Sequence, residues 1–482
     1  MPTTVGERKS RLAPVHRMIR EIDRRTLARL GILAAVCAGA WHAITTFGRP
    51  YVFFDMKIYH GAVVWWANGN NLYEFVAPLT TLGFTYPPFA ALVMLPMAVL
   101  PMPVAGWINV VASIAALTVV LAALVGPMAE RYGWSRWFAI ALAVPLAIAI
   151  EPVRETLGYG QVNLLLFGLI MADLVALRWR ARGGARPDAS GPLRRFWYSG
   201  AWAGAGVGLA TSIKLTPALF VVYFVVTRQW RPALTAIGTA LAATIGTFMI
   251  AGEESTTYFT KVLWQTERVG NADMTPNQSL SGVLARLYDS VETPGLLWLS
   301  FALLMLTVGI SRASHAHAEG DELTAFTLVG LTSHVISPIS WSHHLVFVIP
   351  AIIVLADAAL RRRRASRALI SRGVGPRFLP GLIGVTTLRN PIWFPMLTGL
   401  RHASAAIGLY LLFLISPIWP YEHKLPYSSH YEDGLFGVLM ENSLALALIV
   451  VVAALPWRPG AEPAFDTEPA IRAERRALNR VA

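Results

Sequence analysis

The sequence predicts an all-α polytopic membrane protein with about twelve transmembrane helices. Hydrophobic residues make up 55% of the 482-residue chain, charged residues make up 14%, and the mean hydropathy is +0.50. The charged residues collect in short clusters between long apolar runs, as expected where hydrocarbon excludes ions and unpaired backbone groups. A soluble fold could not bury this much apolar surface, so the bilayer is the expected solvent.

The predicted crossings are apolar runs that approach the length of about 20 residues needed to span a bilayer. They centre on residues 30–47, 103–125, 137–150, 161–177, 197–212, 217–227, 233–251, 296–311, 324–336, 345–360, 403–419 and 436–456. The segment 88–100 is bounded by prolines and is predicted to be re-entrant or interfacial. An additional crossing there would move the arginines near residue 180 to the other side of the membrane.

The basic clusters agree with this topology under the positive-inside rule. We expect a cytoplasmic arm at 1–29, a membrane domain at 30–456 and a cytoplasmic tail at 457–482, with the stretch 378–400 also on the cytoplasmic side. The net charge of +13 is then explained by topology and anionic lipid headgroups, without nucleic acid. The single cysteine, Cys37, excludes an intramolecular disulfide and a cysteine metal cluster.

The polar residues gather in the predicted external loops, which are 48–86, 151–160, 213–216, 252–295, 337–344 and 420–435. Asp55 follows the first crossing among aromatic neighbours. A carboxyl group at an apolar interface should have a raised pKa, which suits a general base near neutral pH. The alternative is an exposed loop acid that pairs with Lys57 or Arg49.

Aromatic and amide residues at 65–73 and 86–88 could form a wall on which sugars stack, although an interfacial aromatic belt explains them equally well. The glycines of 158–163 precede a helix and could let a phosphate or sugar approach free backbone N–H groups, or simply form the turn. Lys214 lies in a very short connection between two crossings. A lysine at membrane depth indicates a phosphate site, and the alternative is that it extends to the headgroups.

The densest polar signal is His334, followed by the segment 337–344, which contains His343 and His344 beside a tryptophan and serines. The two adjacent histidines, with the tryptophan and the serines, can hold a phosphate by hydrogen bonds. The segment 271–279 could bind sugar hydroxyls or cap the next helix. The sequence contains no P-loop, dinucleotide fingerprint or HExxH motif, so nucleotide-driven transport and zinc proteolysis are not supported. No metal or other cofactor is expected.

Taken in order, several of these motifs resemble those of the actinobacterial α-mannosyltransferases of glycosyltransferase family 87, which use polyprenyl-phosphate mannose. The motifs are residues 55–59, 85–88, 160–163, 213–217, 277–279 and 337–344. The resemblance does not cover the N-terminal arm, residues 361–400 or the tail. It implies the C-type glycosyltransferase architecture, with periplasmic loops that form the active site.

The resemblance also implies an activity: inverting transfer of mannose from decaprenyl-phosphate mannose to a phosphatidylinositol mannoside, lipomannan or lipoarabinomannan, with an α-1,2 linkage. Asp55 would be the catalytic base. Lys214, His343 and His344 would bind the phosphate of the mannosyl donor. Contacts to the sugar or acceptor are expected from Tyr59, Gln161, Asn163, Asn277, Gln278 and Trp341.

Three other functions fit a chain of this kind. A flippase or transporter of lipid-linked sugars would also have many crossings, but such proteins commonly bind at mid-bilayer between related halves. Here the polar groups gather at one face and no second half repeats the first. The histidine and amide clusters disfavour a non-catalytic scaffold. A transferase that uses decaprenyl-phosphate arabinose would need similar chemistry and stays open.

Overall fold

The computed structural model describes residues 24–182, 191–265, 268–290, 292–371, 398–424 and 434–461. Within these ranges the chain is helical and has no β-strand, only the isolated bridges Val76–Gly83 and Asn277–Trp341. The predicted all-α fold is therefore confirmed for the described part. Most of the predicted arm, the stretch 378–397 and most of the tail lie outside it.

The helices up to the middle of the chain, with 3₁₀ helices written η, are α2 (Arg24–Phe47), α3 (Phe54–Ala67), η1 (Leu72–Glu74), α4 (Pro88–Met94), η2 (Leu95–Val99), α5 (Met102–Tyr132), α6 (Arg136–Ala149), α7 (Glu151–Tyr159), α8 (Asn163–Ala181), α9 (Pro192–Ser199), α10 (Ala205–Ile213), η3 (Thr216–Ala218), α11 (Leu219–Val226) and α12 (Trp230–Ile250). The remaining helices are α13 (Gly252–Thr260), η4 (Val262–Trp264), α14 (Leu280–Leu287), α15 (Gly295–Ala318), α16 (Glu322–Ile336), η6 (Ser342–His344), α17 (Val348–Ser371), α19 (Leu400–Ile415), α20 (Trp419–His423), α21 (Gly434–Glu441) and α22 (Ser443–Ala454).

Five helical segments among the described residues are long and apolar enough to cross a bilayer: α2, α5, α12, α15 and the pair α19–α20. Two bent pairs, α6–α7 at 71° and α21–α22 at 67°, raise the number to seven if each is one crossing. The predicted number of about twelve is not confirmed. Two of the predicted crossings, 217–227 and 324–336, correspond to apolar helices of fewer than 18 residues. The segment 88–100 is likewise too short for a full crossing, as expected.

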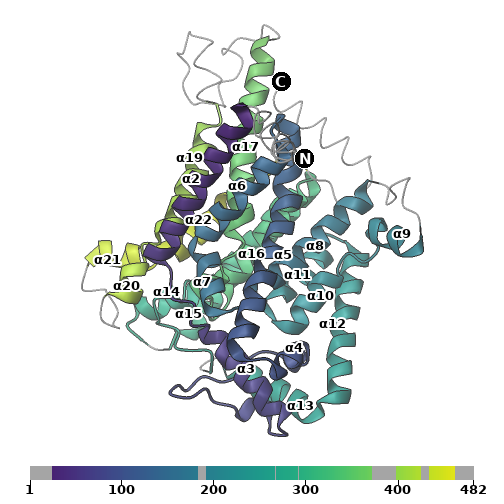
Figure 1. The fold of residues 1–482 in the computed structure, drawn as a ribbon, viewed down its shortest axis with the longest axis vertical. Helices are drawn as coiled ribbons and strands as arrows, with labels where there is room; N and C mark the ends of the chain where they lie inside the picture. Colours follow the sequence, from purple (N-terminus) through teal and green to yellow (C-terminus); the bar gives the residue numbers. More distant parts are fainter. Residues whose placement is uncertain are drawn as a thin grey trace, which may run out of the picture.

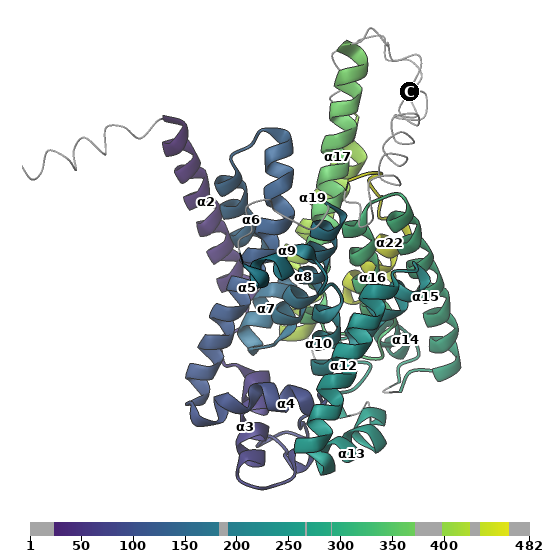
Figure 2. The ribbon, with the colours of Figure 1, turned by 90° about the vertical axis from the view of Figure 1, so that its right-hand side faces the viewer.

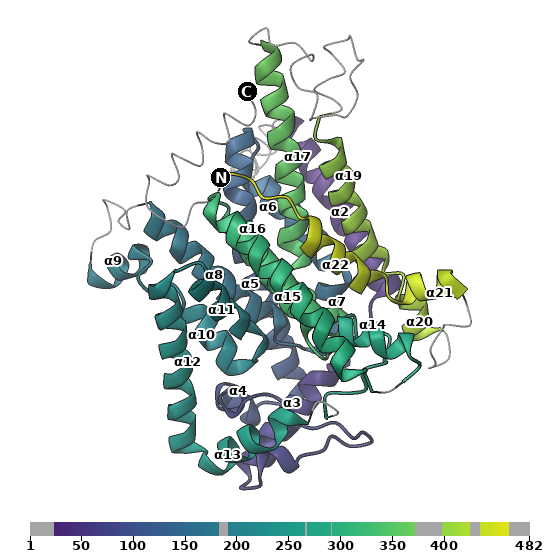
Figure 3. The ribbon, with the colours of Figure 1, turned by 180° about the vertical axis from the view of Figure 1, so that it is seen from behind.

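The helices form one bundle around α16 (Figure 1). All residues of α16 except Ile336 are buried, as expected for a helix that is apolar on all sides. On the back of the molecule α15 and α22 lie against it (Figure 3). Gly309 allows a close approach there, because a Cβ atom at this position would overlap the side chain of Thr332. In contrast, α2, α12 and α15 expose many apolar side chains, which suits contact with lipid.

The two ends of the bundle differ in composition. Helices α3, α4 and α13 lie together at one end, whereas α2 begins and α17 finishes at the other (Figures 1 and 2). Helices α3 and α13 belong to the predicted external loops 48–86 and 252–295, and α4 belongs to the segment predicted to be re-entrant or interfacial. Of the candidate residues, Asp55 and Tyr59 lie on α3.

A buried charge cluster closes the opposite end of the bundle. Arg458, which follows α22, is within 2.6 Å of Asp321 and 2.8 Å of Asp357. Asp357 also pairs with Arg361 at 2.7 Å and accepts a hydrogen bond from Tyr132. These contacts join the ends of α5 and α22 to α16 and α17.

We expect Arg458→Ala to destabilise the protein by about 3 kcal/mol, because it leaves Asp321 buried with little compensation. Thermal unfolding of the purified protein in detergent measures this change. Arg136→Ala is the matched control, since the Arg136–Glu130 pair has both side chains 57% exposed and should contribute little. Equal melting temperatures for the two variants would contradict the structural role of Arg458.

Candidate active site

Asp55 lies in the first turn of α3, and the residue before this helix is held in an unusual conformation. Phe53 has a φ of 52°, its N–H donates to the carbonyl of Gly158 at 3.1 Å, and its side chain is buried. A left-handed conformation costs a non-glycine residue roughly 1 kcal/mol or more and persists only where the surroundings impose it. The packing around Phe53 therefore fixes where α3 begins.

Gly160 brings this turn against the end of α7. Its φ is +72°, and a Cβ atom there would lie 2.7 Å from Cβ of Met56. Glycine satisfies both requirements, because it adopts positive φ without strain and has no side chain. The close approach puts the next residue, Gln161, beside Asp55.

A chain of hydrogen bonds leads away from Asp55. Nε2 of Gln161 donates to Oδ2 of Asp55 at 2.6 Å, and Oε1 of Gln161 accepts from the hydroxyl of Tyr86 at 3.1 Å. The Tyr86 and Tyr59 hydroxyls are 2.9 Å apart, and Asn109 donates to the Gln161 carbonyl. Oδ1 of Asp55 accepts no hydrogen bond from the part of the chain that the structure describes, which leaves it available to a substrate hydroxyl.

The environment of Asp55 changes its acidity. Burial raises the pKa of this carboxyl group to about 6, although the hydrogen bond from Gln161 and the positive charges of Lys214 and Arg49 oppose the shift. The side chain is only half-buried in the structure, so it is reachable from outside. A carboxylate with these properties can accept a proton near neutral pH.

Lys214, whose charge acts on this carboxylate, meets His344. Nζ of Lys214 is 3.1 Å from Nε2 of His344 and 5.4 Å from the ring centre of Tyr86. The backbone N–H of Trp341 donates to Nδ1 of His344 at 3.2 Å, so the neutral imidazole carries its proton on Nε2. The Lys214 ammonium and the His344 N–H are then two adjacent donors. An anionic oxygen that accepts from both would stabilise this arrangement.

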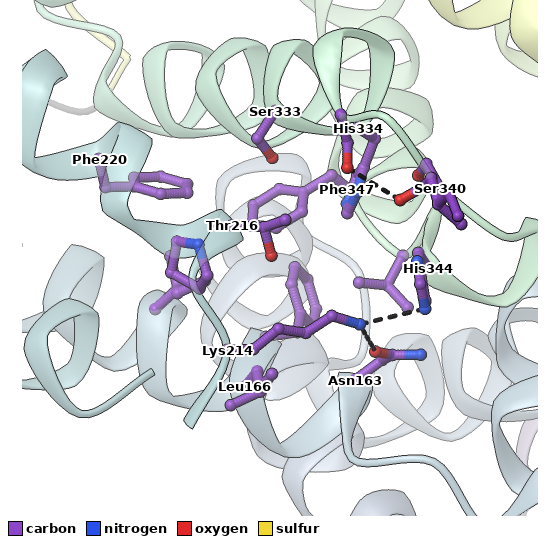
Figure 4. Close-up of a pocket in the computed structure, with 16 residues that line it drawn as sticks. Asn163, Leu166, Lys214, Thr216, Phe220, Ser333, His334, Ser340, His344 and Phe347 are labelled. Atoms are coloured by element: carbon purple, nitrogen blue, oxygen red, sulfur yellow. Dashed lines mark hydrogen bonds between the residues drawn. The ribbon is translucent and has the colours of Figure 1, made fainter. Parts of the chain in front are cut away.

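A small cavity extends from this pair toward α16, with His334 on its wall (Figure 4). Nε2 of His334 is buried and has no hydrogen-bond partner among the described residues. Ser333 and Thr216 also line the cavity. No local pattern assigned a role to His334, because only the fold brings α16 next to Lys214.

His343 and Asn163 support the same loop. The carbonyl of His343 accepts from the hydroxyl of Thr156 at 2.9 Å and from the side chain of Asn163 at 3.0 Å. Asn163 also accepts from Lys214 at 3.4 Å. The buried ring of His343 packs on Tyr159, and its Nε2 has no partner in the described ranges. Thus all three candidate phosphate ligands are close together.

Asn277 and Gln278 are fully buried, and their side chains bond backbone groups. Asn277 accepts from the N–H of Ser340 at 2.9 Å, and Gln278 donates to the carbonyl of Glu441 and accepts from the N–H of Ala445. The bond between Asn277 and Ser340 holds the loop that carries the histidines, and the bonds of Gln278 hold the junction of α21 and α22. The expected contact of these two amides with sugar stays a prediction, as does that of Trp341, which is half-buried and covers Gly270.

A second charge cluster, around Arg49, lies next to Tyr159, on which the ring of His343 packs. Arg49 pairs with Glu155 at 2.8 Å and with Glu422 at 3.0 Å, and its guanidinium lies 5.1 Å from the ring centre of Tyr159. It therefore joins the end of α2 to α7 and α20. The sequence allowed Arg49 as a partner for Asp55, but the ion-pair partners of Arg49 are Glu155 and Glu422.

Comparisons with known proteins identify the family of the chain. The profile of glycosyltransferase family 87 matches residues 84–338. A polyprenol-phosphate-mannose-dependent alpha-(1-2)-phosphatidylinositol mannoside mannosyltransferase of Mycobacterium tuberculosis is 31% identical, with 80% of this chain and 90% of the relative covered. The protein of the same name from Mycolicibacterium smegmatis is 34% identical, and the match covers 69% of this chain and 75% of the relative.

A polyprenol-phosphate-mannose-dependent alpha-(1-2)-phosphatidylinositol pentamannoside mannosyltransferase from Mycolicibacterium smegmatis is 31% identical, covering 72% of this chain and 79% of the relative. The crystal structure of ArnT from Cupriavidus metallidurans bound to undecaprenyl phosphate aligns with a TM-score of 0.37 and 19% identity. The alignment covers 88% of this chain and 76% of ArnT. A TM-score this low supports no conclusion about the site.

We expect Gly160→Ala to destabilise the protein by about 2 kcal/mol or more, because alanine is strained at positive φ and its methyl group would overlap Met56. Gly69→Ala is the matched control: its φ is +86°, but no atom lies within 4 Å of an added Cβ. Thermal unfolding in detergent should show a larger loss for Gly160→Ala. Equal losses would mean that backbone strain alone matters and that the contact with Met56 does not.

Proposed function

Because the chain belongs to glycosyltransferase family 87, we propose that it transfers mannose from a polyprenyl-phosphate mannose to a hydroxyl of a phosphatidylinositol mannoside, lipomannan or lipoarabinomannan, forming an α-1,2 linkage. The mannosyl donor and the linkage are those in the names of the relatives. One observation carries the proposal. The half-buried carboxylate of Asp55 has an oxygen without a hydrogen-bond partner among the described residues, and it is close enough to Lys214, which meets His344, for the lysine charge to lower its pKa.

The proposed reaction is a single displacement. The acceptor oxygen forms a bond to the anomeric carbon from the face opposite the phosphate, while the bond from that carbon to the phosphate oxygen breaks. Asp55 takes the proton of the acceptor hydroxyl, and polyprenyl phosphate leaves with the bonding electron pair. A β-linked mannosyl donor then gives an α-linked product, and one carboxylate suffices.

The leaving phosphate needs no proton, but its growing negative charge needs donors. Lys214 and His344 supply an ammonium and an imidazole N–H, and the unpartnered rings of His343 and His334 are close to them. Gln161 holds Oδ2 of Asp55 so that Oδ1 meets the acceptor. Tyr59, Asn163 and Trp341 are proposed to contact the sugars or the acceptor.

The proposed topology has about twelve crossings in the C-type glycosyltransferase architecture, in the plasma membrane. The site would face the periplasm, and the arm 1–29 and the tail 457–482 would lie in the cytoplasm around a membrane domain at 30–456. The arginines at the end of α8 and in the turn before α12 support this orientation, because both lie at the end of the bundle away from Asp55.

Asp55→Asn should lower the rate of mannose transfer by at least about 1,000-fold, since the amide keeps the shape of the side chain but accepts no proton. The measurement is transfer from polyprenyl-phosphate mannose to purified phosphatidylinositol mannosides and lipomannan by the detergent-solubilised protein. Glu74→Gln removes an exposed carboxylate from the same external region and should leave the rate unchanged.

Normal transfer by a folded Asp55→Asn protein would disprove the mechanism while leaving the family assignment intact. If the wild-type protein transfers no mannose but moves the lipid across liposome membranes, the transporter function is correct instead. Transfer of arabinose in place of mannose would identify a different sugar donor.

The pH dependence gives a second test of the base. Asp55 acts when deprotonated, so kcat/KM should be constant above its pKa and fall as the pH drops through about 6. The hydrogen bond from Gln161 lowers this pKa, so Gln161→Ala should move the fall in kcat/KM to higher pH. A fall that stays at the same pH in Gln161→Ala would contradict the assignment of the titrating group to Asp55.

A further inference from the structure

A second cavity, of about 520 Å³, lies at the end of α8 that is far from the candidate active site. Asn163 begins α8 at the active site, whereas Arg180 lines this cavity, so about 25 Å of helix separates the two. The lining residues are Leu177, Arg180, Ala181, Thr227 to Pro232 and His317. The volume is in the range of known small-molecule sites, about 300–1,000 Å³.

The described lining carries three arginines and no acid. None of the guanidinium groups of Arg180, Arg228 and Arg231 forms an ion pair within the described ranges. The carboxylate of Glu322 is near, but it is bonded to His317 at 2.6 Å, to Gln229 at 3.1 Å and to the hydroxyl of Tyr223. The arginines therefore lack compensating negative charge from these residues.

The start of α12 adds a second attraction for an anion at the same place. This helix has 21 residues and begins at Trp230, and no side chain caps its N-terminus. Its first backbone N–H groups and its dipole favour negative charge. The tight turn that precedes it holds Arg228 at a φ of 57°. The turn and the helix end thus converge on one site.

The surroundings match a lipid better than a free anion. Directly beside the cavity, α11 exposes Val225 and Val226, and α12 exposes Leu234 and Leu241. Trp230, 56% exposed, lies at the boundary between the polar cavity and this apolar surface. Tryptophan at such a boundary is typical of the level of lipid headgroups. An occupant with an anionic head and apolar chains would contact both surfaces.

We propose that this cavity binds the phosphodiester headgroup of an anionic phospholipid in the membrane leaflet opposite the active site. The guanidinium groups of Arg180, Arg228 and Arg231 donate to the phosphate, and the acyl chains lie along the exposed faces of α11 and α12. The proposal does not depend on the transfer reaction.

Native mass spectrometry of the full-length protein in detergent tests it, with phosphatidylglycerol and phosphatidylcholine of the same chain length as probes. Wild type should retain phosphatidylglycerol at least about tenfold more strongly than phosphatidylcholine, and Arg228→Gln with Arg231→Gln should remove this preference. Arg194→Gln with Arg195→Gln is the matched control, because it removes the same charge from exposed positions on α9 that do not line the cavity.

Equal losses from the two double variants would show general surface attraction and overturn the proposal. So would equal retention of both lipids by wild type, or displacement of phosphatidylglycerol by millimolar inorganic phosphate, which would indicate a free-anion site. Arg228→Gly guards against misfolding: glycine relieves the strain of positive φ, so the protein should keep its melting temperature and still bind phosphatidylglycerol several-fold more weakly. Unchanged binding in this variant would also contradict the proposal.

Discussion

The contact between Met56 and Gly160 determines where the carboxylate of Asp55 lies. It requires a residue that has no side chain and tolerates positive φ, and it brings the first turn of α3 against the end of α7. Gln161 follows immediately and bonds Asp55, and through Tyr86 the same network reaches Lys214. One close backbone approach thus positions Asp55 on α3 beside Gln161, and the network extends from there to the lysine at the end of α10.

The interior contains several ionised groups, and each of those described next lies against groups that compensate its charge. Arg49 pairs with two glutamates and Arg458 pairs with two aspartates, so each of these two arginines has partners of opposite charge. Asp173, in the middle of α8, instead accepts from the backbone N–H groups of Gly206 and Val207 at the start of α10. These contacts join helices to one another, and we assign them a structural role.

The sequence predicted the membrane class and the all-α fold, because apolar runs and arginine clusters are local properties. Local patterns also singled out Asp55, Lys214, His343 and His344, and their catalytic and phosphate-binding roles stay predictions. The number of crossings was harder, because a bent pair such as α6–α7 and a short buried helix such as α16 need neighbours to define them. No local pattern indicates that Asn277 and Gln278 bond backbone, or that His334 lies near Lys214.

The partners of Lys214 differ from those of Arg49 and Arg458. Arg49 and Arg458 are neutralised by carboxylates of this chain, whereas Lys214 donates to Asn163 and lies 3.1 Å from Nε2 of His344, and neither partner carries a negative charge. With Nδ1 of His344 occupied by the N–H of Trp341, its other nitrogen is a donor as well. Two donors without a shared acceptor are poorly satisfied on their own at the edge of a membrane. An anion from outside the chain, such as the phosphate that the proposed reaction releases, supplies the acceptor they lack.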